Sequence, residues 1–225
     1  MSDPIPPRDQ PRDRLIAAIR SGDGDTLDAL LETEPGLAAA TDEHGVSLLL
    51  TALYHRRPDL AERIAARRSA LTLHEAVALG RHAAVVEALD SGEGAVEDRS
   101  VDGFTPLQYG AFFGREDVVA ELLARGADVG AASANPMKVQ PLHSAATIQS
   151  VAICRRLLEA GADPDARQQV GYTPLMSAAL RGNEELVELL LAHGADPRIV
   201  ADDGKTARDL ALQGGFQTVA DRLSG

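Results

Sequence analysis

The stretch GFTPLQYGAFFGREDVVAELLARGAD, residues 103–128, decides the fold because the chain repeats it. It returns as GYTPLMSAALRGNEELVELLLAHGAD at residues 171–196, with the shorter copy QPLHSAATIQSVAICRRLLEAGAD between them at residues 140–163. A fourth copy, GKTARDLALQGGFQTVADRL, begins at residue 204. If the third residue of each TPL-like triplet is taken as the anchor of a unit, the anchors are 33 to 35 residues apart. This period indicates an array of small stacked units. The four anchors are Leu107, Leu142, Leu175 and Arg208.

Three weaker copies precede these four, with anchors at Leu15, Leu49 and Leu73. The alignment of the seven copies can be tested at a second repeat position, because the residue three positions after every anchor is small. We call these seven residues the small-residue column. A small side chain at that position lets neighbouring helices approach closely, whereas a larger one would push the units apart. The seven small residues are Ala18, Ala52, Ala76, Gly110, Ala145, Ala178 and Ala211.

The strong copies read as two helices separated by turns. Thr105 is a natural N-cap followed by Pro106 at the first helical position, and Thr173 and Pro174 repeat this pair. Gly114 and Gly182 then end the first helix, where a left-handed residue is favoured. The pairs Asp102-Gly103 and Asp203-Gly204 favour tight turns, which predicts a finger-like hairpin between units.

At these positions the chain resembles the ankyrin repeat, with its TPLxxxA motif, a glycine, a second helix rich in valine and leucine, and a closing GAD. The resemblance covers residues 13–225 and is strongest over residues 99–225. It implies an all-α solenoid of about seven helix-turn-helix units with short β-hairpin-like fingers, capped by its first and last units. Residues 1–12 are rich in proline and polar side chains, and are expected to form a flexible N-terminal tail.

Three departures from the repeat pattern affect the expected geometry. The step from Leu49 to Leu73 is only 24 residues, which predicts that the finger between these units is lost or much reduced. Residues 131–139 carry two extra residues before the fifth unit. Gln149 stands where a helix-ending glycine is usual, and the sequence leaves open how the turn forms there.

Composition restricts the classes of function. The chain has 34 acidic and 22 basic residues, a net charge of −12 that argues against nucleic acid as a partner and favours a basic surface on a protein. Its single cysteine excludes an intrachain disulfide, and the sequence has neither a secretory signal nor a membrane-spanning segment, so a cytoplasmic monomer is expected. High contents of alanine, arginine and aspartate are typical of GC-rich bacterial genomes.

Motifs that could carry chemistry are incomplete. Gly204-Lys205-Thr206 lacks the earlier glycine of a phosphate-binding loop, because residue 199 is isoleucine. His74 lacks a second histidine one turn on, where a zinc site would need it, because residue 78 is alanine. Cys154 lies among apolar residues of a helix and is expected to be a buried thiol. We therefore expect no catalytic site, no metal and no cofactor, and predict that the chain is not an enzyme.

The resemblance gives other roles to two histidines and to the inner surface. His74 and His143 occupy the histidine position of the TPLH motif, where the imidazole orders a turn by hydrogen bonding. Partners of this family contact the finger tips and the inner face of the first helices. Six of the seven aromatic residues fall in these regions, and aromatic residues are enriched where binding energy concentrates. The predicted partner-binding residues are Tyr54, Phe104, Tyr109, Phe112, Phe113, Met137, Val139, Ile148, Tyr172, Leu180 and Arg181.

The predicted function is a protein–protein interaction module or adaptor that binds a partner through the concave face and finger tips. Two alternatives stay open. The aromatic rings could instead pack between units and never meet a partner. The chain could also be an immunity-like or antitoxin-like inhibitor of a basic enzyme, which the acidic net charge would favour.

Overall fold

The computed structural model describes residues 10–224, where the chain forms seven consecutive helix-turn-helix pairs. These residues contain no β-strand, and one isolated bridge joins Thr41 and Ser47. The predicted all-α array of seven units is therefore confirmed. The pairs are α1 (Pro11–Ser21) and α2 (Gly24–Thr33); α3 (Leu48–Tyr54) and α4 (Pro58–Ala65); α5 (Leu73–Leu79) and α6 (His82–Ser91); α7 (Pro106–Phe112) and α8 (Glu116–Ala124); α9 (Pro141–Thr147) and α10 (Val151–Glu159); α11 (Pro174–Arg181) and α12 (Glu184–Ala192); and α13 (Ala207–Gln213) and α14 (Gln217–Arg222), with short 3-10 helices at Pro35–Ala39 and Gln169–Gly171.

The first helix begins slightly earlier than the sequence predicts. Helix α1 starts at Pro11, two residues before the predicted start of the repeat domain at residue 13. Proline suits the first turn of a helix, because the N–H that it lacks would have no partner there. Residues 1–9 of the predicted flexible tail lie outside the described residues.

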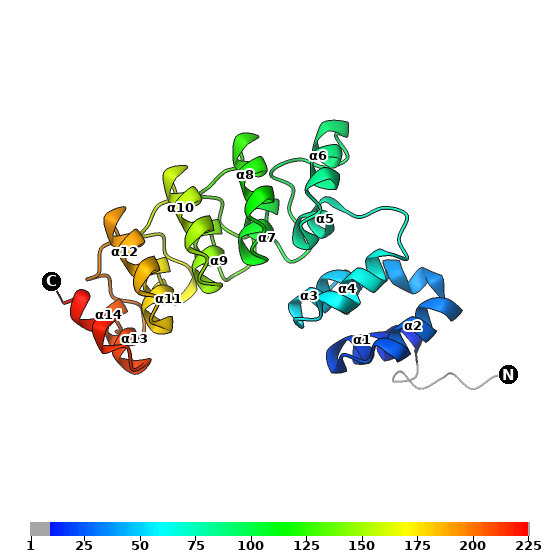
Figure 1. The fold of residues 1–225 in the computed structure, drawn as a ribbon, viewed down its shortest axis with the longest axis horizontal. Coiled ribbons are helices and arrows are strands. Elements are labelled where there is room, and N and C mark those ends of the chain that lie inside the picture. The colour runs from blue at the N-terminus through cyan, green and yellow to red at the C-terminus, as the bar shows by residue number, and fades with distance from the viewer. Residues whose placement is uncertain (1–9, 225) are drawn as a thin grey trace.

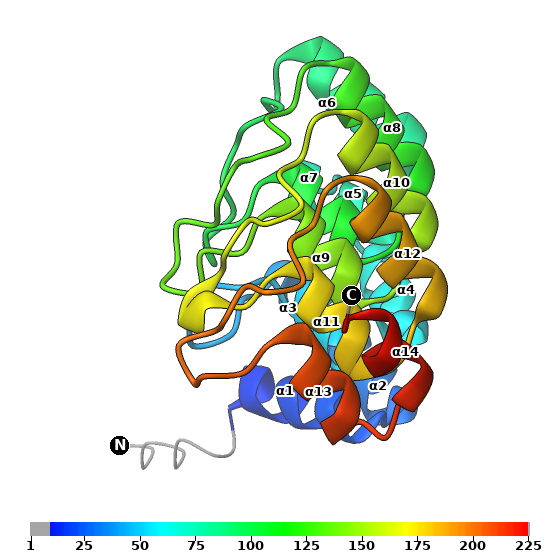
Figure 2. The same ribbon diagram turned by 90° about the vertical axis from the view of Figure 1, so that its left-hand side faces the viewer.

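The pairs stack into an arch (Figure 1). Seen along the stack, the second helices α6, α8, α10 and α12 form an outer row, and the first helices α7, α9 and α11 form an inner row (Figure 2). The connecting segments project from the side of the inner row as a third layer (Figure 2). The inner helices and the connecting segments therefore share the concave side of the arch.

Burial confirms the register of small residues. All seven members of the small-residue column are buried. The fourth unit shows why, because a Cβ added to Gly110 would lie 3.1 Å from the Val119 Cγ2 atom and 3.7 Å from the Val77 Cγ1 atom. The first contact is tight and the second joins the neighbouring unit, so side-chain size at this column limits how closely the helices approach.

The turn inside each unit passes through one left-handed residue, seven positions after the anchor. Five of the seven residues are glycines, which adopt positive φ at little cost. Gln149, whose turn the sequence left open, takes the same conformation with φ of 61°. Its side-chain amide donates to the backbone oxygens of Ala146 at 2.5 Å and Ser177 at 3.2 Å, which anchors the strained turn to the next unit. The left-handed residues are Gly22, Arg56, Gly80, Gly114, Gln149, Gly182 and Gly215.

The fingers are tight backbone loops, each closed by a hydrogen bond across its base. Four of them join residues four positions apart, as in the bond from the Ser100 N–H to the Phe104 oxygen at 2.9 Å. The fifth unit's finger joins the Ser133 N–H to the Val139 oxygen at 2.7 Å, six positions apart. The two extra residues predicted before the fifth unit thus extend the tip of its finger. The closing pairs are Asp42/Val46, Ser100/Phe104, Ser133/Val139, Gln168/Tyr172 and Ala201/Lys205.

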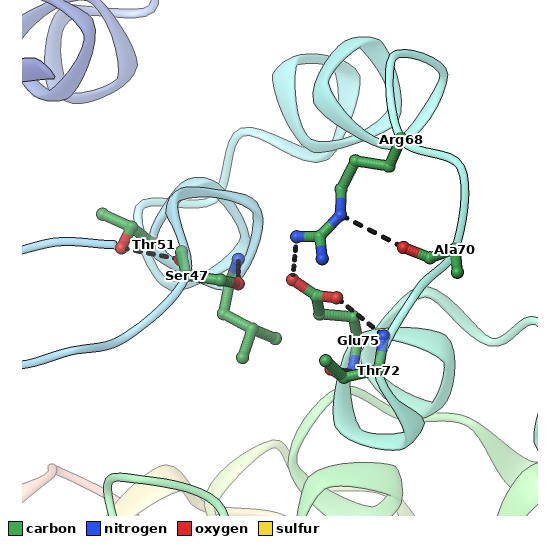
Figure 3. Close-up of polar contacts among 7 residues, drawn as sticks. Ser47, Thr51, Arg68, Ala70, Thr72 and Glu75 are labelled. Atoms are coloured by element: carbon green, nitrogen blue, oxygen red, sulfur yellow. Dashed lines mark hydrogen bonds and ion pairs between the residues drawn. The ribbon is translucent and has the colours of Figure 1, made fainter. Parts of the chain in front are cut away.

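The third unit has no finger, as the short step in the sequence predicts. Residues 66–72 run directly from α4 to α5 and carry Arg68, whose Nη1 atom lies 2.7 Å from the buried Glu75 carboxylate (Figure 3). The fingers of the second and fourth units come together where the third finger is missing. A Cβ added to Gly45 in the first of these fingers would lie 3.2 Å from the Val101 Cγ1 atom in the other. Beneath them remains a hollow of about 340 Å³, lined by both members of the ion pair.

The TPLH histidine position behaves differently in two units. The Nδ1 atom of His143 accepts from the Gln140 N–H at 3.2 Å, and its Nε2 atom lies 2.9 Å from the Ala166 oxygen in the next finger. In the third unit two different side chains make these two contacts. The Glu75 carboxylate accepts from the Thr72 N–H at 2.9 Å, and the His74 Nε2 atom lies 3.2 Å from the Asp98 oxygen. His74 therefore orders the next segment but does not cap its own helix.

Replacing His143 with glutamine should reduce the loss of stability in acid. Burial lowers the pKa of His143, so the folded chain binds this proton less readily than the unfolded chain, where histidine titrates near 6.5. Its contribution to stability is therefore complete above about pH 6.5 and declines as the pH falls through the lowered pKa. Gln108 makes the equivalent two bonds in the fourth unit, so glutamine can replace the imidazole without a titrating group.

Urea unfolding at about pH 7 and about pH 5 measures this effect. His143→Gln should narrow the difference in midpoint between the two pH values and change stability at the higher value by no more than about 1 kcal/mol. His55→Gln, at an exposed position, is the matched control and should leave the difference unchanged. If His143→Gln and the native chain lose equal stability between the two pH values, His143 does not contribute to the acid sensitivity.

Candidate functional site

A groove of about 780 Å³ lies between the inner helices and the fingers. Its walls come from the end of α3, from α7 and α9, from the fingers of the fourth and fifth units, and from Gln168 at the base of the sixth unit's finger. Most of the lining is apolar or aromatic, and one residue, Asp102, is charged. The lining residues are Tyr54, Val101, Asp102, Phe104, Gln108, Tyr109, Phe112, Phe113, Asn135, Pro136, Met137, Val139, Ser144, Thr147 and Gln168.

The floor of the groove is an aromatic cluster that joins units two and four. The Phe113 ring lies 5.1 Å from Phe112, 5.6 Å from Tyr54 and 5.7 Å from Tyr109, measured between ring centroids. These distances fall in the range where aromatic rings attract one another. Tyr54 reaches across the third unit because the corresponding residue there, five positions after the anchor, is the small Ala78.

A carboxylate holds the hydroxyl ends of the tyrosines. Asp102 accepts hydrogen bonds from the Tyr54 hydroxyl at 2.7 Å, the Tyr109 hydroxyl at 2.9 Å and the Ser100 hydroxyl at 2.5 Å. Burial and the neighbouring hydroxyl and carboxylate groups raise the pKa of Tyr54, and burial and Asp102 raise the pKa of Tyr109. Both phenols therefore stay protonated and donate to Asp102.

The extended finger of the fifth unit forms the opposite wall. Asn135 fixes its tip, since its amide donates to the Asp102 backbone oxygen at 2.9 Å and its side-chain oxygen accepts from the Met137 N–H at 3.0 Å. Met137 consequently stands at the edge of the groove with 44% of its surface exposed. The two extra residues of this finger thus place a flexible apolar side chain beside the aromatic cluster, where it can adapt to a bound surface.

The structure brings seven of the eleven predicted binding residues together in this groove. Tyr109 is only 2% exposed, so its ring packs between units, as the alternative interpretation allowed for some rings. The other four predicted residues are not among the lining residues. Ile148 and Leu180 are 38% and 37% exposed at the ends of α9 and α11. Arg181 is also exposed, and Tyr172 donates to Asp203 at 3.0 Å in the last finger.

Sequence reasoning missed several groove residues, of which Asp102 matters most. Its position before Gly103 reads as a turn signal, and nothing in that pair indicates contact with two tyrosines from different units. Asn135 and Pro136 lie in the insertion, whose conformation the repeat pattern could not supply. Gln108 could have been found, because it follows the anchor directly, as His143 does in the fifth unit.

Burial shifts the pKa of two groups that could carry chemistry, Cys154 and His74. Cys154 is fully buried, and burial raises its pKa to about 12, so it remains a thiol. Burial also lowers the pKa of His74. Across residues 10–224, no cluster of three or more histidine, cysteine or acidic side chains is arranged to hold a metal ion. In the same span, no helix has the length and apolar character needed to cross a membrane.

Comparison with known proteins identifies the repeats. A family model described as ankyrin repeats in three copies matches residues 73–168 and 142–224. Ankyrin repeat and SOCS box protein 16 from Mus musculus is 41% identical over 115 residues, which are 48% of this chain and 25% of that protein. Tyrosine-protein kinase Shark from Drosophila melanogaster is 34% identical over 152 residues, 67% of this chain and 16% of the kinase.

A third relative is the human transient receptor potential cation channel subfamily A member 1, 37% identical over 125 residues, 54% of this chain and 11% of the channel. The chain thus spans no more than a quarter of the length of these relatives. Two of these names describe different activities, a tyrosine-protein kinase and a cation channel, and the first names ankyrin repeats, which are what this chain shares with it. Such repeats indicate a protein–protein interaction module, and the family is typically not enzymatic. With the family model covering most of the sequence and seven helix pairs in register, the chain belongs to the ankyrin-repeat family.

Proposed function

We propose that the chain binds a partner protein through the groove between its inner helices and the fingers of units four and five. The observation that carries the proposal is an apolar groove of about 780 Å³ whose aromatic and methionine side chains are partly exposed. A concave and mostly apolar cleft of this volume falls in the range of about 300 to 1,000 Å³ that ligand-binding sites occupy. Aromatic residues and methionine are also the side chains enriched in the buried centre of interfaces.

The position of the groove supports the proposal. It lies around the fourth of seven units, so a partner that covers it can also contact fingers and inner helices on both sides. Binding energy concentrates in a central cluster surrounded by contacts that exclude water. Ile148 and Leu180 continue a row of partly exposed apolar residues away from the groove and could contribute such surrounding contacts.

Affinity capture from a lysate of the native host tests the proposal with two matched baits. Phe112→Ala combined with Met137→Ala removes two exposed groove side chains, which are 38% and 44% exposed in the folded chain. A partner of the groove should bind this bait at least about tenfold more weakly. Leu212→Ala is the control, since Leu212 is 39% exposed on α13 outside the groove.

Circular dichroism and thermal unfolding should first show that both baits are folded. A protein retained by the native chain and the Leu212 control, but lost with the groove variant, supports the proposal. A protein held equally by all three baits would place the binding surface elsewhere.

A narrower form of the proposal is inhibition of a basic enzyme. The net charge of −12 favours association with a positively charged protein and speeds the encounter at low salt. If the captured partner is an enzyme, its activity should fall when this chain is added in equal amount, and the groove variant should inhibit less. Full activity in the complex would exclude inhibition and leave the adaptor function.

A further inference from the structure

We propose that the occupant of the groove is a partner segment in which a lysine or arginine stands beside an apolar side chain, with its positive charge on Asp102. This inference rests on the proposed function and specifies the chemistry of the partner. It starts from the charge of the groove, because Asp102 is the only charged residue among its lining residues.

Hydrogen-bond donors surround the Asp102 carboxylate, but it pairs with no cation of residues 10–224. Its donors are the neutral hydroxyls of Tyr54, Tyr109 and Ser100. The nearby Arg99 guanidinium donates instead to the backbone oxygens of Gly103 and Ala132. A carboxylate in an apolar setting gains most from a cation, because the low local dielectric strengthens the attraction. The two phenol oxygens also keep free lone pairs, so an ammonium or guanidinium group would find three acceptors together.

The last finger shows what the same arrangement looks like with its cation present. Asp203 occupies the same repeat position as Asp102, five residues before the anchor, and likewise accepts from a tyrosine, Tyr172, at 3.0 Å. There the chain supplies the charge itself, since the Lys205 Nζ atom lies 3.6 Å from the Asp203 carboxylate. In the fourth unit the position of Lys205 is occupied by Phe104. The groove therefore has an aromatic side chain where the last finger has its own cation.

The surroundings of Asp102 suit the apolar part of such a segment. Phe104, Phe113 and Val139 present carbon atoms to the groove, and lysine and arginine place their aliphatic stems on such surfaces while their charged ends reach polar groups. Met137 at the edge offers a place for the neighbouring apolar side chain of the partner. The acidic net charge of the whole chain would attract a basic segment before contact.

Selection from a library of random linear peptides displayed on phage tests this chemistry, because the peptides can be selected before the partner is identified. The baits are the native chain, Asp102→Asn, Asp203→Asn, and the double variant Phe112→Ala/Met137→Ala. Asp102→Asn keeps the shape and the acceptor oxygen but removes the charge, and thermal unfolding should confirm that it is folded. Asp203→Asn removes a charge at the same repeat position outside the groove, and is the matched control.

We expect the native chain and Asp203→Asn to enrich peptides with a basic residue next to an apolar one. Asp102→Asn should enrich apolar peptides without the basic preference, and the double variant should enrich neither. Peptides that depend on Phe112 and Met137 but show no basic preference with the native chain would overturn the charge assignment and retain the groove. Peptides that bind all four baits equally would overturn the groove itself.

A synthetic copy of one enriched peptide gives the quantitative test. Replacing its basic residue with norleucine should weaken binding to the native chain by about tenfold or more, because a desolvated charge pair is lost. The same replacement should have a much smaller effect on Asp102→Asn, whereas Asp203→Asn should respond like the native chain. An equal effect on the native chain and on Asp102→Asn would show that the cation binds elsewhere.

Discussion

Replacing Glu75 with alanine is expected to lower the free energy of unfolding by about 3 kcal/mol, because it leaves the Arg68 guanidinium without its carboxylate and the Thr72 N–H without its cap. The Glu75 side chain is only 1% exposed and that of Arg68 is 15% exposed, so water replaces the lost contacts poorly. The hollow beside the pair admits some relaxation, so the expected loss lies at the lower end of the range for buried pairs. Urea unfolding at neutral pH measures the loss.

Two further variants separate the charge from the cap. Glu75→Gln should lose less unfolding free energy than Glu75→Ala, because Gln108 shows that a glutamine at this position of the helix can accept from the capping N–H. Adding Arg68→Met to Glu75→Gln should recover part of the loss, since no unpaired charge then remains. If Glu75→Ala unfolds at the same urea concentration as the native chain, the ion pair does not stabilise the boundary that lacks a finger.

Replacing Gly182 with alanine should cost about 2 to 3 kcal/mol, mainly in the last unit. The backbone at Gly182 has φ of 68°, which a residue with a Cβ adopts only with strain. The new Cβ would also lie 2.2 Å from the Phe216 ring, which packs over this glycine from the loop before α14. The ring must move away, which loses one of the contacts between the last unit and the end of α11.

Gly194→Ala is the matched control, because Gly194 has φ of 92° but no heavy atom near the position of an added Cβ. It should show only the backbone cost, about 1 kcal/mol. Hydrogen exchange followed by mass spectrometry should show faster exchange in α13 and α14 for Gly182→Ala, with the first five units unchanged. Equal losses in the two variants would mean that Phe216 contributes nothing to the packing of the last unit.

Much of the fold follows from the spacing of a few residue types. The anchors and the small residues predict seven units, and the structure places Ala18 and Ala211, at opposite ends of the array, in the same buried position. The turn at Gln149 could not be predicted, because its left-handed backbone depends on a side-chain bond to Ser177 in the next unit. A repeat pattern gives the residue that is usual at a position, but not the contacts that permit an exception.

The groove was predictable in part. The aromatic residues that lie close together in the sequence of the fourth unit, Phe104, Phe112 and Phe113, line the same groove as Tyr54, and their role in binding stays a prediction. The boundaries of the groove depend on the missing finger of the third unit and on the extended finger of the fifth unit. The spacing of residues along the chain does not give the shape of either region. For this reason Asp102 appeared to be a turn residue only, and Leu180 appeared to belong to the same patch although it lies beyond the groove.

The contact between Tyr54 and Asp102 has a consequence for cooperativity. In a regular repeat array each unit is stabilised by itself and by its immediate neighbours, so structure can be lost one unit at a time. The hydrogen bond from Tyr54 to Asp102 joins the second unit to the fourth and passes over the third. This adds a coupling between second neighbours, so units two to four should form and melt as one block. The surface that we propose for binding would then keep its shape while the ends of the array fray.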